Sequence, residues 1–247
     1  MPRVGLVVPA LDEERALPLV LAELPPGEVQ VLVVVDNGSR DRTAEVARAA
    51  GAFVVPEPRR GYGSACQAGL AALFGEHPDP RLRVPAPLGR EDVVVFLDAD
   101  HSDHPEELPL LLAPIREGRA DFVVGSRVLG GASLRAMLPQ AWFGNRLACL
   151  LMRLLFGLRA TDLGPFRAIR AGALRDLHMV DLDYGWTVEM QLKAHVAGLR
   201  TVEVPVRYRP RIGRSKITGT LSGTLRASWK ILSWILGWRL RLRPPRR

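Results

Sequence analysis

The sequence predicts an α/β fold with a doubly wound, mostly parallel sheet. Short apolar runs alternate with segments of helical periodicity through the first half of the chain, which is the rhythm of successive βαβ units. The run Val93–Leu97 is apolar at every position, as expected for a strand buried on both faces. Acidic and turn-forming residues follow several of these runs, where open α/β sheets bind ligands.

Most of the expected strands are apolar runs bounded by turn-forming or polar residues, whereas Phe166–Ile169 and Thr201–Tyr208 are strand-like runs that include charged residues. The expected helices are segments of helical spacing or segments that follow a Ser/Asp-rich turn. We expect strands at Val4–Val8, Val29–Val35, Ala52–Val55, Val93–Leu97, Phe122–Gly125, Phe166–Ile169 and Thr201–Tyr208. We expect helices at residues 17–24, Thr43–Ala50, Gly63–Leu73, Glu106–Glu117, Trp142–Phe156, Thr187–Ala197 and Leu221–Leu242. The Pro-rich stretch from Glu76 to Arg90 is expected to be a surface loop.

The composition indicates a folded chain with an anionic partner. Of 247 residues, 47% are hydrophobic and 24% are charged, and the formal net charge is +8. Cations gather in Arg207–Lys216 and Arg239–Arg247, so nucleotide phosphates, anionic lipid and nucleic acid are all candidate partners. Aromatic clusters that could stack RNA bases are absent from the strand-like segments, so we expect no nucleic acid partner.

Cysteine usage and hydropathy predict a cytoplasmic protein that rests on the inner face of the membrane. Cys66 and Cys149 have neither a metal-ligand spacing nor a partnered motif, which favours a reducing compartment. The first residues lack the pattern of a signal peptide. No uncharged apolar stretch reaches roughly 18 residues, the length that a membrane-spanning helix requires.

Carboxylates follow three of the expected strands. Asp98 and Asp100 come directly after Val93–Leu97, while Glu13 follows the first strand and Asp36 follows the second. Each segment alone could be only a turn or a helix cap, since Asp, Asn and Ser favour such places. A buried acidic edge is costly unless it binds something, and hard carboxylate oxygens suit Mg²⁺ or Mn²⁺ that carries substrate phosphates.

The segment Arg60-Gly61-Tyr62-Gly63-Ser64-Ala65 lies at the start of an expected helix and has two possible uses. Its glycines are typical of a phosphate-binding loop, but the Lys-Ser/Thr of a P-loop and the third glycine of a dinucleotide fingerprint are missing. The same glycines would equally serve close backbone packing beside a ligand or a tight turn into the helix. Both interpretations stay open.

A series of short motifs carries a resemblance to a known family. They are, in chain order, Pro9-Ala10-Leu11-Asp12-Glu13, Asp36-Asn37-Gly38-Ser39, Gly61-Tyr62-Gly63, Asp98-Ala99-Asp100, Gly125-Ser126-Arg127, Asp162-Leu163-Gly164-Pro165-Phe166-Arg167 and Arg211-Ile212-Gly213-Arg214-Ser215-Lys216. On these motifs the chain resembles the family-2 glycosyltransferases of the GT-A fold, and within them the polyprenyl-phosphate (dolichyl-phosphate) mannose synthase-like branch. The resemblance covers residues 4–218 and implies a nucleotide-diphospho-sugar donor, Mg²⁺ or Mn²⁺, and an inverting transfer.

The resemblance also implies roles for individual residues. It implies that Asp98 and Asp100 hold the metal, with Asp98 also near the ribose. It places the following residues in the nucleotide-sugar pocket: Pro9, Ala10, Leu11, Glu13, Asp36, Gly61, Gly63 and Ala99. It places Arg127, Asp162 and Arg167 on the acceptor side. It places Arg211, Arg214 and Lys216 in a basic loop that closes over the diphosphate.

The acceptor decides whether a general base is needed. A lipid phosphate is already an anionic nucleophile, which Arg127 and Arg167 would position. A hydroxyl acceptor needs a base, for which Asp162 and Glu189 are the candidates. Three positions depart from the family pattern: Asn37 where a second Asp is common, Ser102 where some members have a Gln metal ligand, and Pro165 in the acceptor loop.

The expected function is transfer of a hexose, mannose or glucose, from a GDP- or UDP-sugar to a polyprenyl phosphate at the cytoplasmic membrane face. The alternatives are a soluble family-2 glycosyltransferase with a small-molecule or glycan acceptor, and a non-catalytic nucleotide-sugar binding module. We expect a GT-A domain over residues 1–218, with a nucleotide-sugar half (1–130) and an acceptor-side half (131–218). Residues 219–247 are expected to form a basic, Trp-rich helix and tail, either at the membrane interface or packed on the core.

Overall fold

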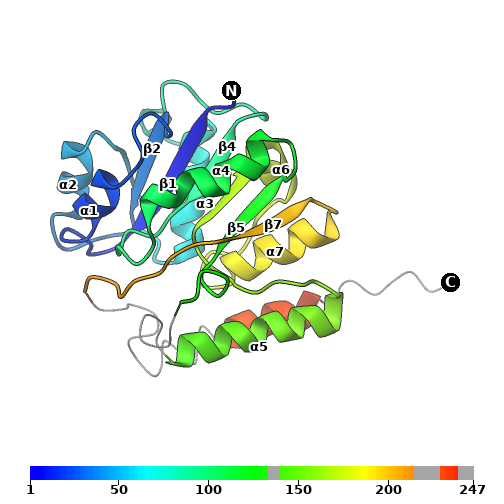
Figure 1. Ribbon diagram of the computed structural model, residues 1–247. Coiled ribbons are helices and arrows are strands. Elements are labelled where there is room, and N and C mark those ends of the chain that lie inside the picture. The colour runs from blue at the N-terminus through cyan, green and yellow to red at the C-terminus, as the bar shows by residue number, and fades with distance from the viewer. Residues whose placement is uncertain (133–138, 214–228, 239–247) are drawn as a thin grey trace.

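One seven-stranded sheet organises the chain, and Figure 1 shows helices on both of its faces. The computed structural model describes residues 1–132, 139–213 and 229–238. The strands are β1 (Val4–Ala10), β2 (Val31–Asp36), β3 (Phe53–Pro56), β4 (Val93–Phe96), β5 (Phe122–Ser126), β6 (Arg167–Arg170) and β7 (Thr201–Pro205). The helices are α1 (Leu17–Ala22), α2 (Thr43–Ala49), α3 (Tyr62–Leu73), α4 (Leu108–Arg116), α5 (Pro139–Phe156), α6 (Ala171–Asp176) and α7 (Trp186–Val196). Residues 229–238 form a further helix, which we call the C-terminal helix.

The strand order β3-β2-β1-β4-β6-β5-β7 confirms the predicted mostly parallel sheet. Only β6 is antiparallel to its neighbours, β4 and β5. The register places Ala10 of β1 beside Asp36 of β2, and Val7 of β1 beside Phe96 of β4. The segments that follow β1, β2 and β4 therefore leave the sheet at the same edge, as the sequence predicted.

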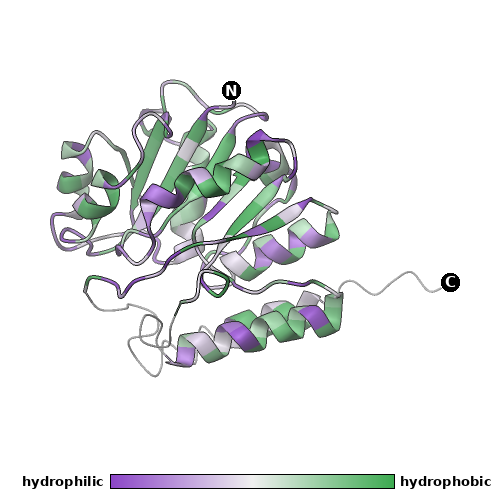
Figure 2. Cartoon of the chain, in the orientation of Figure 1, coloured by the Kyte–Doolittle hydropathy of each residue, from purple (hydrophilic) through white to green (hydrophobic). Residues whose placement is uncertain are grey.

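Two apolar cores cover the two faces of the sheet, because successive side chains of a strand point to opposite sides. Val7 packs in the core beneath α3, α6 and α7, whereas Leu6 and Val8 pack in the core beneath α1, α2 and α4. Figure 2 shows the strands as predominantly hydrophobic, in agreement with the continuous apolar runs of the sequence. This double coverage is why the strands do not alternate apolar and polar residues.

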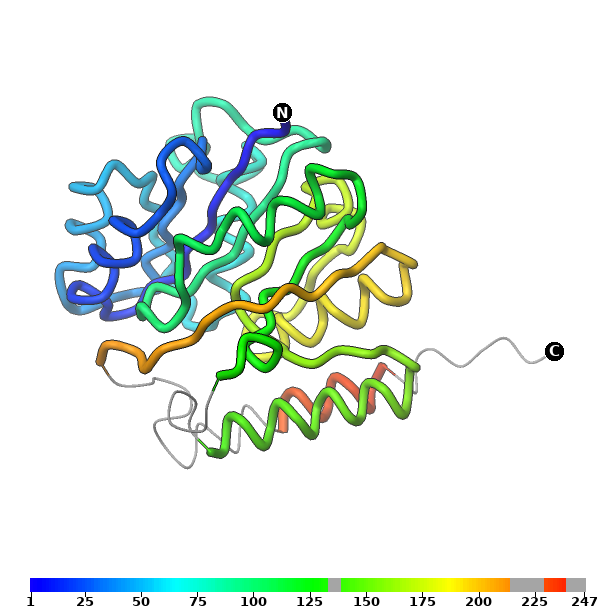
Figure 3. Tube along the Cα trace, in the orientation of Figure 1, coloured from blue at the N-terminus to red at the C-terminus, as the bar shows by residue number. Residues whose placement is uncertain are grey.

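A third apolar cluster joins α5, α7 and the C-terminal helix. Figures 1 and 3 show the C-terminal helix, in red, alongside α5. Met152 of α5, Val188 of α7 and Ile235 of the C-terminal helix are each 0% exposed within this cluster. Thus the part of the predicted helix Leu221–Leu242 that the structure describes packs on the core. Across the described ranges, no helix is long and apolar enough to cross a membrane.

The differences from the expected elements have local causes. The expected helix Glu106–Glu117 begins as a 3-10 turn at Pro105–Glu107 before α4, and the expected strand Thr201–Tyr208 ends at a proline. The six-residue helix α6 was not predicted, because it is too short to show periodicity. The stretch from Glu76 to Arg90 is only partly a surface loop, since Val84 and Leu88 are buried in the core beneath α3.

Candidate functional site

A cavity of about 370 Å³ opens at the edge of the sheet where β1, β2 and β4 end, and we call it the edge cavity. Its position follows from the parallel register, which brings these strand ends together. Its lining residues are Pro9, Ala10, Leu11, Glu13, Asn37, Arg60, Gly61, Tyr62, Ala65, Asp98, Ala99, Asp100, Asp183, Tyr184 and Arg211. Most of the predicted nucleotide-sugar residues are in this set.

Asp98 and Asp100 enter the cavity from the end of β4. Asp100 is 4% exposed, and its Oδ1 accepts a hydrogen bond of 2.9 Å from the backbone N–H of Ser102. Asp98 Oδ1 is buried and has no hydrogen-bond partner among the described residues. Burial, together with the nearby Asp100 carboxylate, raises the pKa of Asp98 to about 7. An unsatisfied carboxylate oxygen beside a second carboxylate is a site that a cation would complete.

The segment after β7 brings a cation to the acidic pair. Arg209 donates its backbone N–H to Ser102 O at 2.9 Å, and Ile212 donates its own to Asp100 O at 3.0 Å. These bonds hold Arg211 in an ion pair with the Asp100 carboxylate. The sequence predicted a basic loop here, and Arg211 is at the cavity. Arg214 and Lys216 lie outside the described residues.

Asn37, rather than Asp36, lines the cavity at the end of β2. The Asp36 carboxylate instead accepts a bond of 2.9 Å from the backbone N–H of Ser39. Asn37 donates through Nδ2 to the carbonyl oxygens of Glu57 (2.9 Å) and Arg59 (2.7 Å), and its Oδ1 accepts from Gly61 N (3.0 Å). Asn37 therefore fixes the loop before α3, a task that needs both a donor and an acceptor and that an aspartate could not perform.

The Gly61-Tyr62-Gly63 segment is a site of close backbone packing. A Cβ on Gly61 would lie 2.1 Å from Leu182 O, and one on Gly63 would lie 2.2 Å from Asp181 O. Gly61 lines the cavity and Gly63 is not among its lining residues. Of the two uses that the sequence left open, the structure favours packing beside the cavity. The Tyr62 hydroxyl of this segment is a hydrogen-bond partner of Asp98.

Asp183 and Tyr184 form a wall of the cavity that the sequence did not predict. They belong to the loop of residues 181–185, which precedes α7 and packs against the start of α3. No local pattern distinguishes this loop from an ordinary connection between helices. Tyr62, Ala65 and Arg60 were also missed as lining residues, although the motif that contains them was recognised.

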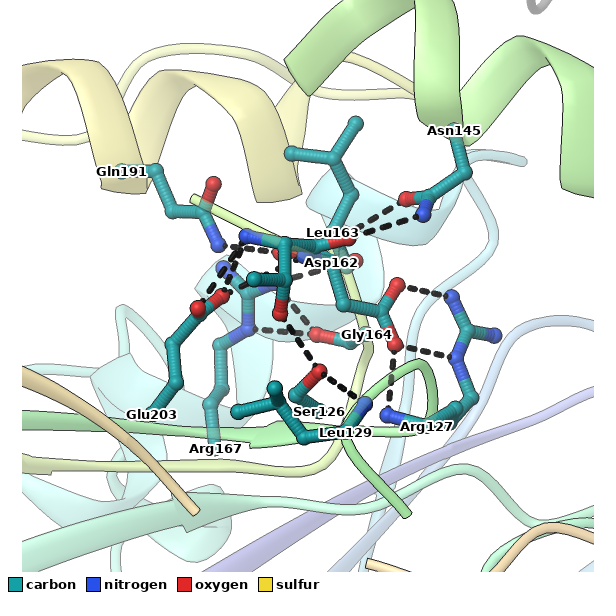
Figure 4. A network of polar contacts seen from close by, with 11 residues as sticks. Ser126, Arg127, Leu129, Asn145, Asp162, Leu163, Gly164, Arg167, Gln191 and Glu203 are labelled. Carbon is teal, nitrogen blue, oxygen red and sulfur yellow. Dashed lines mark hydrogen bonds and ion pairs between the residues drawn. The ribbon is translucent and has the colours of Figure 1, made fainter. Parts of the chain in front are cut away.

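Arg127 and Asp162, which are expected on the acceptor side, form an ion pair in which the carboxylate is fully buried (Figure 4). Asp162 is 0% exposed and accepts from the backbone N–H and Nε of Arg127, both at 2.8 Å, and from its Nη2 at 2.7 Å. Glu203 accepts from the backbone N–H groups of Thr161 and Asp162, and Gln191 donates to Asp162 O at 2.7 Å. This network fixes the loop that carries Asp162.

Arg167 and Glu189 have structural partners. Arg167 is 0% exposed and donates to the carbonyl oxygens of Leu163, Gly164 and Thr187, and burial lowers its pKa to about 10. Glu189 accepts from the backbone N–H groups of Val180 (2.8 Å) and Asp181 (2.7 Å) and pairs with Lys193. Neither residue is among those that line the edge cavity. We therefore assign no acceptor contact to Arg167 and no general-base role to Glu189 in the proposed reaction.

Asp103 is a further buried carboxylate near the acidic pair. It is 2% exposed, and neither of its carboxylate oxygens has a hydrogen-bond partner in the described part of the chain. Burial raises the pKa of Asp103 well above its usual range, and the nearby Asp98 charge adds to this effect. It follows Asp100 by three residues, but it was not predicted as a site residue.

The donor set suits a hard divalent cation that also binds a substrate. No group of three or more His, Cys, Asp or Glu side chains in the described ranges could enclose a metal. Two carboxylates with an unsatisfied oxygen are the kind of partial site that Mg²⁺ uses when substrate phosphates complete its coordination. The cavity therefore has the chemistry for a nucleoside beside a metal-bound diphosphate.

Comparisons with known proteins agree with this chemistry. A profile described as glycosyl transferase family 2 matches residues 6–177. An uncharacterized glycosyltransferase of Mycobacterium tuberculosis is 38% identical over 239 residues, 93% of this chain and 98% of its own. The undecaprenyl-phosphate mannosyltransferase of Micrococcus luteus is 35% identical over 246 residues, 90% of each chain.

The fold is also shared with a solved structure, that of glucosyl-3-phosphoglycerate synthase from Mycobacterium tuberculosis in complex with Mg²⁺ and UDP. The TM-score is 0.70 at 24% sequence identity, and the match covers 98% of this chain and 80% of that chain. The predicted GT-A fold is thereby confirmed. The profile and the relatives show the family: the chain belongs to glycosyl transferase family 2 and is a glycosyltransferase.

Proposed function

We propose that the chain transfers a hexose, mannose or glucose, from a nucleoside-diphosphate sugar to a polyprenyl phosphate, with inversion, at the cytoplasmic face of the membrane. The observation that carries this proposal is the edge cavity, which joins a nucleoside-sized hollow to the Asp98–Asp100 pair and Arg211. The residues after β1, together with Asn37, border the nucleoside end. The Micrococcus luteus relative is named a mannosyltransferase and the solved structure holds UDP, and both support the donor class.

Asp98 and Asp100 would hold Mg²⁺ or Mn²⁺. When bound, the cation supplies positive charge to the departing diphosphate. Arg211, on the segment after β7, faces the same end of the cavity and adds a fixed charge at the leaving group. Tyr62 orients Asp98 through its hydroxyl, and Asn37 keeps the loop before α3 in place.

A phosphate acceptor agrees with the state of the two candidate bases. Asp162 is fully engaged by Arg127, and Glu189 is fully engaged by backbone N–H groups and Lys193. An ionised phosphate needs neither, whereas a hydroxyl acceptor does. The name of the Micrococcus luteus relative points to the same acceptor.

The exposed apolar side chains of α5 and the C-terminal helix support contact with a membrane. Phe143 and Leu154 of α5 are 65% and 69% exposed, and Trp229 of the C-terminal helix is 75% exposed. Aromatic residues favour the level of the lipid headgroups. A lipid acceptor would be reached from such a surface.

A donor panel tests the proposal. The protein is incubated with radiolabelled GDP- and UDP-sugars, Mg²⁺ or Mn²⁺ and a polyprenyl phosphate, and the mixture is extracted with organic solvent. Label in the organic phase with one donor is the expected result. Label that stays with a water-soluble acceptor would instead support the soluble alternative, and binding without any transfer would support the binding module.

Asp100→Asn should strongly reduce transfer, because an amide cannot supply the charge that holds the cation. We expect kcat/KM to fall by about a thousandfold, the scale of losing a charge-stabilising group in a dry site. Asp176→Asn is the control, since Asp176 lies on the surface and pairs with Arg90 away from the cavity. Wild-type activity in Asp100→Asn would contradict the proposed metal site.

A further inference from the structure

Asp181 is a buried carboxylate that the proposed reaction does not use. It is 3% exposed and begins the loop of residues 181–185 before α7. Its Oδ1 accepts from the backbone N–H groups of Asp183 (2.7 Å) and Gly185 (3.0 Å), so it closes the loop on itself. Its Oδ2 accepts from Trp234 Nε1 and pairs with Lys230 Nζ at 3.1 Å, and both of these donors belong to the C-terminal helix.

The same loop is a wall of the edge cavity. Asp183 and Tyr184 line the cavity, and Leu182 O accepts a bond of 2.9 Å from the backbone N–H of Ser64 at the start of α3. The loop is therefore held from one side by α3 and from the other by the C-terminal helix. The carboxylate of Asp181 connects the second support to the backbone that carries the wall.

The contact between the loop and the helix is close. A Cβ on Gly185 would lie 2.4 Å from Cδ1 and Nε1 of Trp234, so the indole lies directly on the loop backbone. Ile235, the next residue, is 0% exposed in the cluster formed with α5 and α7. The helix is thus anchored beside the contact, and its position sets that of the indole.

We propose that Asp181, Lys230 and Trp234 are positioning residues for the donor, because through them the C-terminal helix holds the Asp183–Tyr184 wall of the edge cavity. This inference rests on the proposed function, in which the cavity binds the donor. Without its two partners, Asp181 would keep a buried negative charge that only backbone N–H groups offset, and the loop would rearrange to hydrate it. A shift of the C-terminal helix would then move the Asp183–Tyr184 wall and so change the affinity for the donor, although the helix itself does not contact the donor.

Two substitutions separate the polar contacts from packing. Trp234→Phe keeps a ring against Gly185 but removes the Nε1–H donor, and Lys230→Met removes the charge but keeps the chain length. In the double variant we expect the donor KM and the Kd of the nucleoside diphosphate to rise by roughly three- to tenfold, a part of what a hydrogen bond to a charged group contributes. We expect kcat to change by less than about twofold, since the reacting groups are untouched. If Lys230 is changed to Arg instead of Met, with Trp234→Phe kept, the charge is retained and most of the lost donor affinity should be recovered.

The control is Ser233→Ala, on the same helix, because the Ser233 side chain is exposed and its hydroxyl donates to Lys230 O within the helix. It should leave KM, Kd and kcat as in the wild type. Hydrogen exchange gives a second readout that needs no ligand: the amides of Asp183 and Gly185 should exchange faster in the double variant and not in the control. Unchanged exchange together with unchanged donor affinity would overturn the inference.

The two proposals fail in different ways. If no nucleotide sugar binds to any variant, the wild type included, the proposed function is wrong and the donor part of this inference falls with it. The exchange result still decides whether the C-terminal helix holds the loop. If the donor binds normally to a double variant whose loop exchanges faster, the wall does not position the donor and the inference is overturned while the proposed function stands.

Discussion

Three carboxylates near the end of β4 differ in how their charges are compensated. Asp100 has a backbone N–H and Arg211 as partners, while Asp98 keeps one unsatisfied oxygen and Asp103 keeps two, among the described residues. Uncompensated buried charge lowers the stability of a fold. Asp98 is a proposed cation ligand, whereas Asp103 has no role in the proposed reaction, so we expect its buried carboxyl to lower stability.

Asp103→Asn should raise the unfolding temperature at neutral pH, because folding there requires Asp103 either to bury an uncompensated charge or to take up a proton, and an amide requires neither. The raised pKa of Asp103 sets the direction: the penalty is absent below the unfolded pKa near 4 and grows as the pH rises towards the folded pKa. The difference in unfolding temperature between Asp103→Asn and wild type should therefore be small near pH 4 and increase at higher pH. Thermal unfolding from pH 4 to 8 measures it.

Asp92→Asn is the matched control for that experiment. Asp92 is also buried, but its carboxylate accepts from Arg3 N (2.8 Å), Arg3 Nη2 (2.9 Å) and Gly89 N (2.9 Å). This variant should lose stability at neutral pH. A loss of similar size in Asp103→Asn would show that Asp103 has a partner that compensates its charge.

At the scale of elements, one ion-pair cluster ties α1 to the segments that border the cavity. Glu23, at the end of α1, pairs with Arg209 after β7 and with His101 after β4. Arg209 also donates to His101 O at 2.8 Å, where the backbone has a φ of 62°. The cluster therefore fixes two segments: the one after β4, which carries Asp100, and the one after β7, which carries Arg211.

Glu23→Gln should lower stability above pH about 5 and have little effect at pH 2. The hydrogen bond from Arg209 lowers the pKa of Glu23 to about 2, so its contribution is complete above the unfolded pKa and is lost as the pH falls through the folded pKa. Urea unfolding at pH 7, 4 and 2 would measure the gap between wild type and variant. A gap that does not close in acid would contradict this assignment.

Gly63→Ala should destabilise the fold by about 1–3 kcal/mol, the cost of forcing an atom into a filled space. The added Cβ would meet Asp181 O at 2.2 Å, and backbone on both sides leaves little freedom to move. Gly144→Ala in α5 is the control, since a Cβ there meets nothing within 4 Å and alanine favours a helix. Chemical denaturation measures both, and equal stabilities would show that the loop can yield.

The elements could be predicted where the chain is locally regular. Apolar or strand-like runs predicted every strand of the sheet, although those of β6 and β7 include charged residues, and the motifs that follow β1, β4 and β7 predicted most of the cavity. Asp36 was assigned in place of Asn37, because adjacent side chains at a strand end point to opposite sides and the sequence does not say which faces the hollow. The Asp183–Tyr184 wall and its support from Trp234 join segments far apart in the chain, so no local pattern reveals them.

For the whole molecule, the third cluster decides how the C-terminal helix lies. Its described residues pack on α5 and α7, which was one of the two interpretations that the sequence allowed, while Trp229 and Leu236 face outward. The two interpretations are thus compatible. One face of the helix packs on the protein and the other is exposed, as the proposed membrane contact requires.

Ile235→Ala should cost about 2–4 kcal/mol of unfolding free energy, because it opens a cavity in that cluster. Leu236→Ala, whose side chain is 51% exposed, should cost less than about 1 kcal/mol. Guanidinium denaturation compares the two neighbours directly. Equal small effects would show that the helix is not part of the folded core.

The ion pair between Arg211 and Asp100 has a consequence for how ligands arrive. At the proposed metal site, a bare divalent ion would have to compete with the Arg211 guanidinium, which already neutralises Asp100. An ion chelated by a diphosphate would bring a second anion with it. Arg211 would then pair with the diphosphate while Asp100 binds the ion, so that neither charge is left without a partner. If the proposed site is correct, this ion pair would favour binding of ion and nucleotide as one complex over binding of the ion first.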